Sequence, residues 1–574
     1  MNFIGKKHIT RRTRIYRGFE GYHPAERIGD REWFSEENLS SRKYPLLCPR
    51  EPRGILRVDK IDALGSLNGL CYIADGTLFY GGRPSSAPVG RGVNRIIPFG
   101  AYLLIFPLGI WVNTLDDNWG MLEKEYPLTG AVGILWCRAD GTVYETVVDG
   151  LTPPENTAQM WLDTASKPPV LKQWSELTGL WSEVEQSCLR IVCDRIDRGF
   201  SVGSRVCFRR HEELEEIFGL EEREILAKGR DFIVLPGAMD SVRKELPLGQ
   251  FELCAPIPEM DLVIAHENRL WGCRYGLNRQ GEFVNEIYAS KLGDFCAWSV
   301  FRGLSTDSYV ASVGMEGPFT GCAVVGGSPV FFKENSLHRI YGTRPANFRI
   351  QSIPCSGVRP GCENSLAMVA DRLFYHGRDG FCIYDGSLPM PFGEEIDHQN
   401  LKNSVAGGLG EYYYIAGEEG EKPVLLVYDS KRRLWHREDS PGIAAFCTVK
   451  DRLYFTGKEK GLFTTAPVEG EAREGLVKWH ATGPVISSEL MESCYLAGIS
   501  LNLSMETNAT LHILAQYDSS GTWESLGSLQ NCRLRAKELP LRPRRCDHLQ
   551  LRLEGRGEVL LHGLSLILEV EGRS

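Results

Sequence analysis

The sequence lacks the cysteine spacing of a metal or redox site. It has seventeen cysteines in 574 residues, an odd number, and no two of them form a C-x-x-C pair. The closest pairs, Cys188/Cys193 and Cys355/Cys362, are too widely spaced for a zinc knuckle. We therefore expect the cysteines to be small buried hydrophobic residues in a protein made in a reducing cytoplasm, with no metal and no other cofactor.

Long apolar runs are missing as well. No window reaches the roughly 18 consecutive apolar residues of a membrane helix. The first residues are basic, without the apolar core of a signal peptide behind them. The net charge of −9 gives no general attraction to DNA or anionic lipid, so any nucleic-acid contact has to be local. The sequence thus predicts no membrane insertion and synthesis in a cytoplasm.

Catalytic motifs are absent or incomplete. Residues 199–203 match G-x-S-x-G, but an apolar strand follows where a nucleophile elbow needs a helix. His211-Glu212 lacks the second histidine of a zinc-binding helix. The adjacent Cys546, Asp547 and His548 would point to opposite faces of a strand and could not share one ion. The sequence therefore predicts no enzyme and no catalytic, cofactor-binding or metal-binding residue.

A repeat with a spacing of forty residues is the clearest positive feature. Each copy has an acidic turn residue, an aromatic-rich strand and a closing glycine, and a second strand follows it. The copies occupy residues 371–377, 411–417 and 451–457. Strand-rich units of about 40 residues in tandem are typical of propeller blades, since one blade cannot cover both faces of its own sheet.

Looser copies extend this pattern toward the N-terminus. Residues 70–80 and 134–144 each form an expected hairpin around Asp-Gly, and further strands are expected at 103–106, 268–272 and 330–333. The predicted fold is all-β, with a β-propeller of about seven blades. Six or eight blades, or two unrelated β domains, are the alternatives.

The pattern changes twice along the chain. It breaks at 179–245, around an acidic stretch expected to be helical, and it stops after 470, where apolar and polar residues alternate as in sandwich strands. An insertion in a propeller loop costs little stability. The predicted organisation is an N-terminal arm and lead-in (1–54), a propeller in two parts (55–178 and 246–470), an inserted small β module (179–245) and a C-terminal β-sandwich (471–574).

The N-terminus is strongly basic, because no acidic residue precedes Glu20. One interpretation is a disordered, solubilising arm. The other is an assembly arm that binds an acidic neighbour or DNA phosphate with salt-dependent affinity. The residues of this arm are Lys6, Lys7, Arg11, Arg12, Arg14 and Arg17.

Several stretches together resemble a family of virion β-propeller proteins from tailed phages and prophages of Gram-positive bacteria. The likeness covers most of the chain and includes structural motifs only. It is similar in architecture to the tail-hub proteins of short-tailed phages, also called nozzle or packaged-DNA stabilisation proteins. The stretches are residues 37–45, 49–53, 200–206, 331–341, 539–548 and 551–555.

This resemblance implies a non-enzymatic structural protein of the virion neck or tail, made in the host bacterial cytoplasm. It implies a ring of copies, most simply a hexamer, that contacts other connector or tail proteins and passes genomic DNA transiently. The alternative is a receptor- or glycan-binding propeller at the tail tip, with residues 411–414 and Trp298 as stacking aromatics. A glycosidase would need paired carboxylates on the propeller axis.

Overall fold

The computed structural model describes residues 8–572, apart from 26, 93–94, 220, 280, 488–493 and 532–534. The chain is nearly all β, and the one α-helix among these residues is α1 (Glu212–Phe218). Short 3-10 turns cover Ser41–Lys43, Ile196–Arg198 and Pro345–Asn347. Within the described part, no helix is long and apolar enough to cross a membrane. Most strands belong to small antiparallel sheets.

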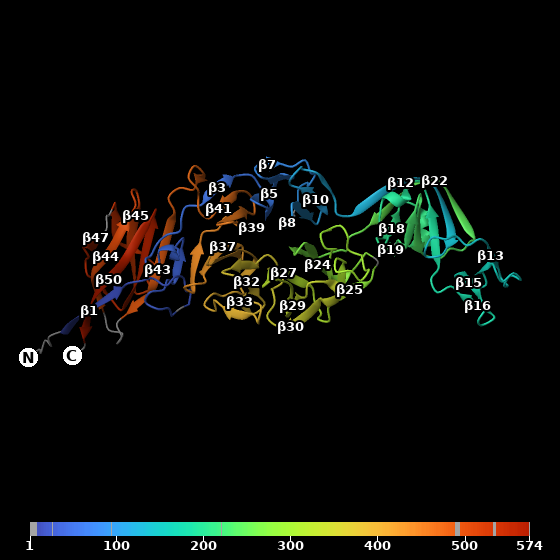
Figure 1. The fold of residues 1–574 in the computed structure, drawn as a ribbon. Helices are drawn as coiled ribbons and strands as arrows, with labels where there is room; N and C mark the ends of the chain where they lie inside the picture. The colour runs from blue at the N-terminus through green and yellow to red at the C-terminus, as the bar shows by residue number, and fades with distance from the viewer. Residues whose placement is uncertain are drawn as a thin grey trace, which may run out of the picture.

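Seven small sheets, here called the sheet ring, occupy the middle of the molecule (Figure 1). Sheet 1 contains β4 (Ile61–Ser66), β5 (Leu70–Ala74), β6 (Thr77–Tyr80) and β7 (Arg83–Pro84). Sheet 2 contains β8 (Arg95–Phe99), β9 (Tyr102–Phe106), β10 (Ile110–Asn113) and β11 (Trp119–Met121). Sheet 3 contains β23 (Leu262–His266), β24 (Arg269–Leu277), β25 (Phe283–Ala289) and β26 (Tyr309–Ser312). Sheets 4 and 5 contain β27 (Phe319–Val325), β28 (Ser328–Lys333), β29 (Ser336–Tyr341) and β30 (Arg349–Pro354); β31 (Ala367–Val369), β32 (Arg372–Gly377), β33 (Gly380–Tyr384) and β34 (Met390–Phe392). Sheets 6 and 7 contain β35 (Leu401–Leu409), β36 (Tyr412–Glu419), β37 (Lys422–Asp429) and β38 (Leu434–Glu438); β39 (Ile443–Val449), β40 (Arg452–Gly457), β41 (Leu462–Thr464), β3 (Gly54–Arg57) and β42 (Ala472–Arg473).

Each sheet of the ring packs on both neighbours. Separate hydrophobic clusters join sheets 1 and 2, 2 and 3, and so on, and the last cluster joins sheet 7 back to sheet 1. In β32, Leu373 and Tyr375 enter the cluster shared with sheet 4, whereas Phe374 enters the cluster shared with sheet 6. A strand buried on both faces reads as a continuous apolar run. This two-sided burial is the physical reason for the aromatic-rich forty-residue repeat.

The hairpin predicted at 70–80 is confirmed. Strands β5 and β6 pair antiparallel, and Asp75 and Gly76 between them both have positive φ, at 51° and 75°. Two residues with positive φ match the type I′ turn, whose twist fits the right-handed twist of the flanking strands. The sequence Asp-Gly is therefore sufficient to fix this connection.

The inserted module, here called the insert, is larger than predicted. Its seven-stranded sheet has the order β19-β18-β22-β12-β17-β21-β20, and a separate four-stranded sheet, the tip sheet, has the order β13-β14-β15-β16. The strands are β12 (Lys124–Cys137), β13 (Val147–Gly150), β14 (Met160–Asp163), β15 (Val170–Ser175), β16 (Leu180–Glu183), β17 (Cys188–Val192), β18 (Arg205–Arg209), β19 (Arg223–Glu224), β20 (Ala227–Gly229), β21 (Phe232–Pro236) and β22 (Arg243–Ala255).

The predicted boundaries 179–245, and with them a propeller part ending at 178, have to be corrected. The long strands β12 and β22 pair with each other along most of their length and enclose residues 124–255 as one unit. The hairpin predicted at 134–144 forms a short turn with a bridge between Cys137 and Val143, but it belongs to the insert and not to the propeller, because residues 134–137 pair with β17. The insert has its own core, which includes Trp136, Phe208 and Phe251. Two sheets of the ring therefore precede the insert and five follow it.

The terminal unit consists of two five-stranded sheets around one hydrophobic cluster. Burial alternates along its strands, as in β49, which confirms the predicted period of two. One sheet contains β1 (His8–Tyr16), β50 (Val559–Gly572), β44 (Cys494–Met505), β47 (Arg535–Leu539) and β48 (Arg545–Cys546). The other contains β2 (Ser35–Glu37), β43 (Lys478–Ser487), β49 (His548–Arg556), β45 (Thr510–Tyr517) and β46 (Glu524–Gln530).

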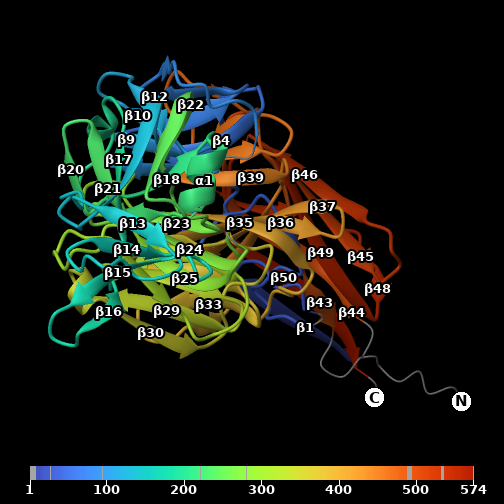
Figure 2. The same cartoon turned by 90° about the vertical axis from the view of Figure 1, so that its right-hand side faces the viewer.

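The lead-in predicted for residues 1–54 is not a separate region. Strand β1 pairs with β50 over nine residues, β2 pairs with β43, and β3 pairs with β41 to complete sheet 7. The segment therefore runs from the terminal unit into the sheet ring. Figure 1 shows the three parts in a row, with the described chain ends at the terminal unit and the tip sheet at the opposite end, and Figure 2 views the molecule from the side of the insert, with α1 in front.

Candidate functional site

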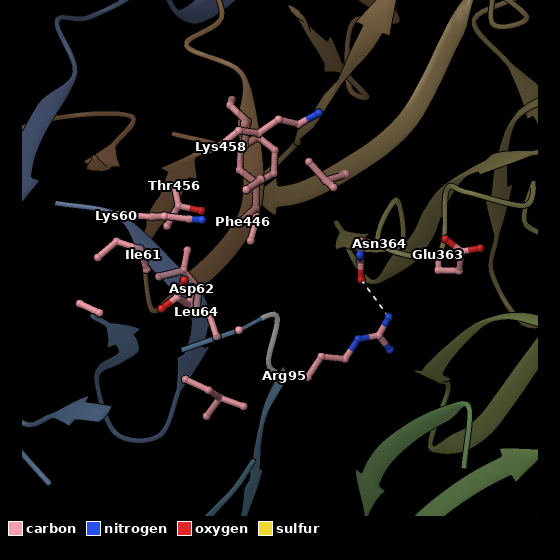
Figure 3. A pocket seen from close by; sticks show the side chains of 18 of the residues that line it. Lys60, Ile61, Asp62, Leu64, Arg95, Glu363, Asn364, Phe446, Thr456 and Lys458 are labelled. Atoms are coloured by element: carbon pink, nitrogen blue, oxygen red, sulfur yellow. Dashed lines mark hydrogen bonds between the residues drawn. The ribbon is translucent and has the colours of Figure 1, made fainter. Parts of the chain in front are cut away.

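A cavity of about 1570 Å³ lies on the axis of the sheet ring (Figure 3). All seven sheets contribute to its wall, each through its first strand or through a loop next to that strand. The side chains that line it are partly apolar, such as Ile61, Leu64 and Phe446, and partly charged, such as Lys60 and Arg95. The cavity is the natural place to look for chemistry on this fold, because several chain segments converge there.

One contact crosses this cavity. Arg95 on β8 donates a hydrogen bond to the side-chain oxygen of Asn364, 3.3 Å away in the loop before β31, as the dashed line in Figure 3 shows. These residues belong to sheets 2 and 5, which are not neighbours in the ring. A hydrogen bond between two side chains therefore crosses the axis of the sheet ring.

The carboxylates of the cavity do not form an obvious acid/base pair. Asp59 forms an ion pair with Arg57 at 3.0 Å, and Asp75 is paired with Arg91. Asp62 and Glu363, in contrast, come from different walls of the cavity in Figure 3. Retaining glycosidases need two carboxyl groups about 5–5.5 Å apart and inverting ones about 6.5–9.5 Å. That the protein has no catalytic set remains a prediction, and the cavity carboxylates are the residues on which it can be tested.

Thiol chemistry in the cavity is equally unfavourable. Cys322 lines the wall, and burial raises the pKa of its thiol to about 11. The thiolate is the reactive form of cysteine, so this side chain is protonated near neutral pH. Cys322 therefore behaves as a hydrophobic wall residue.

A small group of metal-type ligands lies elsewhere. Glu125, Glu252 and Cys254 have ligand atoms within 4.8 Å of one another on β12 and β22, and this is the one such group among the described residues. Arg210 lies 2.8 Å from Glu252, and Arg209 lies 3.6 Å from Glu125. Burial raises the pKa of the Cys254 thiol to about 12. The arginines balance the two carboxylates and the thiol stays protonated, so this group is better described as an ion-pair cluster than as a metal site.

The predicted assembly arm is only partly described, and its described part forms a strand. Arg11, Arg12 and Arg14 lie on β1, and Arg17 follows it, whereas Lys6 and Lys7 lie outside the described residues. The nine-residue pairing of β1 with β50 excludes the disordered interpretation for residues 8–16. Arg11 pairs with Glu569 at 3.5 Å, and Arg14 lies 3.7 Å from Asp30.

The aromatic residues proposed for sugar stacking are core residues instead. Trp298 is buried in the cluster between sheets 2 and 3, and Tyr413 is buried between sheets 5 and 6. Tyr414 packs against the cluster between sheets 6 and 7, where burial raises its pKa. Aromatic residues at these positions fill the spaces between sheets. The sequence alone could not show whether they lie there or in exposed loops.

Sequence reasoning missed a buried ionic contact, here called the terminal joint, made of Arg50, Arg53, Glu438, Asp439 and Glu474. The Arg50 guanidinium lies 2.8 Å from Asp439 and is also paired with Glu474. Arg53 donates to Glu438 at 2.9 Å. Burial alone would lower the pKa of Arg50, but the hydrogen bond to Glu474 and the nearby carboxylates outweigh it and raise the pKa. The joint ties the segment after β2 to the end of β38 and to the chain after β42.

A second set of ion pairs, here called the insert joint, connects the insert to the ring. It is a chain of Arg209, Glu123, Arg279, Glu259 and Arg274. Arg279 lies 3.8 Å from Glu123 and 3.4 Å from Glu259, and Arg274 lies 3.6 Å from Glu259. A cavity of about 510 Å³ lies beside these side chains, between β18 of the insert and sheet 3. No short sequence motif could have revealed either joint, because the partners are far apart in the chain.

Comparisons with known proteins add little. No family model and no curated protein sequence matches this chain. Among solved structures, BamB from Moraxella catarrhalis has 10% sequence identity and a TM-score of 0.30, and covers 75% of this chain and 97% of its own. An exo-beta-1,3-galactanase from Phanerochaete chrysosporium has 9% identity and a TM-score of 0.21, and covers 53% of this chain and 94% of its own. Both scores are too low to support an argument about fold or function, so the chain's own geometry has to carry the assignment.

Proposed function

We propose that this protein is a non-enzymatic structural component of a tailed-phage virion, a hub- or nozzle-like subunit of the head–tail connector or tail. In this proposal the sheet ring is a closed seven-bladed β-propeller and the terminal unit is a β-sandwich. The circular series of seven inter-sheet clusters supports the first assignment. The two sheets that share one cluster support the second.

The observation that carries the proposal is that a separate β module is attached at each end of the ring. A closed ring has satisfied its own sheets and gains nothing from the terminal unit or the insert. Yet the terminal unit is joined to the ring by the largely buried side chains of Arg50, Arg53 and Glu438, and the insert is attached by two long strands, β12 and β22. Modules at opposite ends of a ring are suited to contact neighbouring subunits.

In this proposal the genome channel runs between copies rather than through one chain, because side chains cross the cavity of the ring. Arg95 and Asn364 cross the cavity of the ring, and the cavity wall carries charges of both signs. In a ring of copies, most simply six, the channel would run along the shared axis of the assembly. An overall charge of −9 is compatible with a conduit that does not hold DNA tightly.

A reconstruction of intact virions tests this assignment. We expect six copies around a central channel in the neck or tail, with the three-part subunit recognisable in the density. A virion assembled with the full-length chain carrying Arg11→Glu and Arg12→Glu, two exposed residues of β1, is the assembly control. Five copies at a capsid vertex, or three copies on a fibre, would contradict the hub assignment and leave the fold untouched.

One observation favours receptor or glycan binding at a tail tip as a second candidate. Trp174 and Trp181 face each other across β15 and β16, and Trp161 lies with its ring centroid 5.8 Å from that of Trp181. Lys172 lies over Trp161 and donates to Asp163 at 2.7 Å, so polar groups adjoin the aromatic ones. Aromatic rings beside hydrogen-bonding groups can stack on sugars. Binding to an array of bacterial surface glycans that is lost in Trp174→Ala and kept in Trp298→Phe would favour this candidate.

A further inference from the structure

We propose that the tip sheet of one copy docks on strand β1 of a second copy of this chain. The inference rests on the proposed assembly of several copies and names the two surfaces that would meet. Both surfaces are exposed, they lie at opposite ends of the molecule, and they differ in charge.

The tip sheet combines exposed apolar side chains with acidic ones. Leu177, at the end of the β15–β16 hairpin, is 99% exposed, and Leu151 and Leu180 are also largely exposed. The other face of the same sheet is anchored in the insert core through Leu162 and Leu171. Five exposed carboxylates lie on or next to the tip sheet: Asp149, Glu155, Glu176, Glu183 and Glu185. Exposed apolar residues rimmed by charge are typical of protein-binding surfaces.

Strand β1 has the complementary character. It is the end strand of its sheet and pairs with β50 only, so one edge of its backbone has no strand partner among the described residues. Arg11, Arg12 and Arg17 are exposed along it, and Ile15 between them is 59% exposed. An open edge strand is a template for pairing with another chain, and the basic side chains restrict which chain can approach.

The insert and the N-terminal segment that contains β1 also differ in charge. Residues 124–255, the insert, contain 22 acidic and 15 basic residues, whereas residues 1–53 contain 7 acidic and 12 basic residues. Complementary charge favours the correct partner and speeds its encounter. The acidic insert of one copy therefore attracts the basic N-terminal segment of another copy. Two inserts, or two N-terminal segments, repel each other.

The arrangement of the parts makes this contact intermolecular. Figure 1 shows β1 in the terminal unit and the tip sheet at the far end of the insert, with the sheet ring between them. The two surfaces cannot meet within one molecule. A contact between two different surfaces is heterologous, and it closes into a ring when the rotation between copies allows. The docking thus supplies the repeated contact that a ring of subunits needs.

Charge reversal tests the docking with the full-length chain. The β1 variant carries Arg11→Glu and Arg12→Glu, and the tip variant carries Glu176→Lys and Glu183→Lys. By sedimentation velocity at 50 mM salt, we expect the wild-type protein to associate and each variant alone to associate at least about tenfold more weakly. At 500 mM salt the wild-type association should weaken as well, because exposed charges are screened.

Mixing the two variants gives the sharpest result. In the mixture the native tip of the β1 variant meets the native β1 of the tip variant, and the reversed tip of the tip variant meets the reversed β1 of the β1 variant. Both contacts are complementary in charge, so we expect the mixture to associate in alternating order although each variant alone associates only weakly. A chain with all four substitutions should associate again, because its charges are exchanged rather than lost. The matched control, Arg83→Glu with Arg349→Glu on exposed outer strands of the ring, should behave as the wild type.

Three results would overturn the docking: a wild-type protein that is monomeric at every salt concentration, variants that associate as the wild type does, or a mixture that does not associate. Loss of duplex-DNA binding in the β1 variant, with native self-association in the tip variant, would make β1 a DNA contact instead. These results do not decide the virion role, which depends on where the protein lies in the reconstruction. If the docking is found but the protein lies outside the neck and tail, the hub assignment is refuted and the docking proposal is not.

Discussion

The two joints on either side of the sheet ring use the same chemistry in different surroundings. In the terminal joint, the side chains of Arg50 and Arg53 are 6% and 7% exposed, and their partner Glu474 also accepts a backbone hydrogen bond. In the insert joint, Arg279 is 49% exposed, and a cavity lies beside the ion pairs. Both sets contain arginines and carboxylates in alternation.

The difference in burial decides what each joint can do. A buried ion pair is costly to break, because removing one partner leaves the other charge without water. An exposed pair contributes little and is screened by salt. The terminal unit is therefore fixed to the ring, whereas the insert is held by its two strands and only oriented by its ion pairs.

Substituting Arg50 should give the largest effect. In Arg50→Met the largely buried Glu438 keeps Arg53, whereas Glu474 and Asp439, 28% and 48% exposed, lose Arg50 and are partly solvated, so we expect the free energy of unfolding to fall by about 1–3 kcal/mol. Urea unfolding of the full chain measures it. Arg91→Met, which removes an exposed pair with Asp75, should cost less than about 1 kcal/mol. Equal losses in the two variants would show that burial does not determine how much an ion pair contributes to the stability of this protein.

Acid should weaken the ring and the terminal unit before the insert. Burial lowers the pKa of His338 to about 4, of His376 to about 3 and of His480 to about 4. Their stabilising contribution is full above the unfolded pKa of about 6.5. It is lost as the pH falls toward the folded values, because the unfolded state then binds more protons. All three lie outside the insert.

Thermal scans between pH 7 and pH 4 measure this effect. We expect the melting temperature to fall with pH and the insert to unfold in a separate, less pH-dependent transition. His338→Gln should reduce the slope, whereas His562→Gln on β50 is the control substitution. A single transition with the same slope in all variants would contradict the separation of the two regions.

Breaking the insert joint should change orientation more than stability. In Arg279→Ala we expect a loss of about 0.2–1 kcal/mol, since the side chain is half exposed. Small-angle scattering should show a wider distribution of overall dimensions, as it should for the wild type at 1 M salt, where the Debye length is about 3 Å. Arg230→Ala, on an almost fully exposed side chain of the insert, should leave the distribution unchanged.

Removing the insert should have the smallest effect on the rest of the chain. Replacing residues 124–255 by a short Gly/Ser linker leaves all seven inter-sheet clusters complete, because they contain no insert residue. We expect a soluble protein in which the ring retains its melting temperature. Loss of all soluble protein would mean that the insert is part of the ring closure.

The sequence predicted the parts of the fold whose signals are local. The forty-residue copies correspond to β32, β36 and β40, and the strands that follow them correspond to β33, β37 and β41. Alternation after residue 470 predicted the strands of the terminal unit. These signals depend on which faces of a strand are buried, and the order of apolar and polar residues along the strand follows directly from that burial.

Pairing between distant segments could not be predicted. Strand β12 has the same kind of sequence as a ring hairpin, and only its pairing with β22, more than a hundred residues later, places it in the insert. The basic residues of β1 indicated an arm, because nothing in residues 8–16 reveals the partner strand at 559–572. The joints were missed for the same reason, and the charged cavity residues come from loops of several sheets.

The pairing of β1 with β50 also sets an order of events during synthesis. Strand β1 is made long before its partner, which begins at residue 559, and β3 long before β41 at residue 462. At about 5–20 residues per second, roughly half a minute to two minutes separate the synthesis of β1 from that of its partner. Until then the basic segment 8–16 lacks the strand with which it pairs in the folded protein. Sheets 1 to 6 can form while the chain grows, but the ring closes late and the terminal unit closes last.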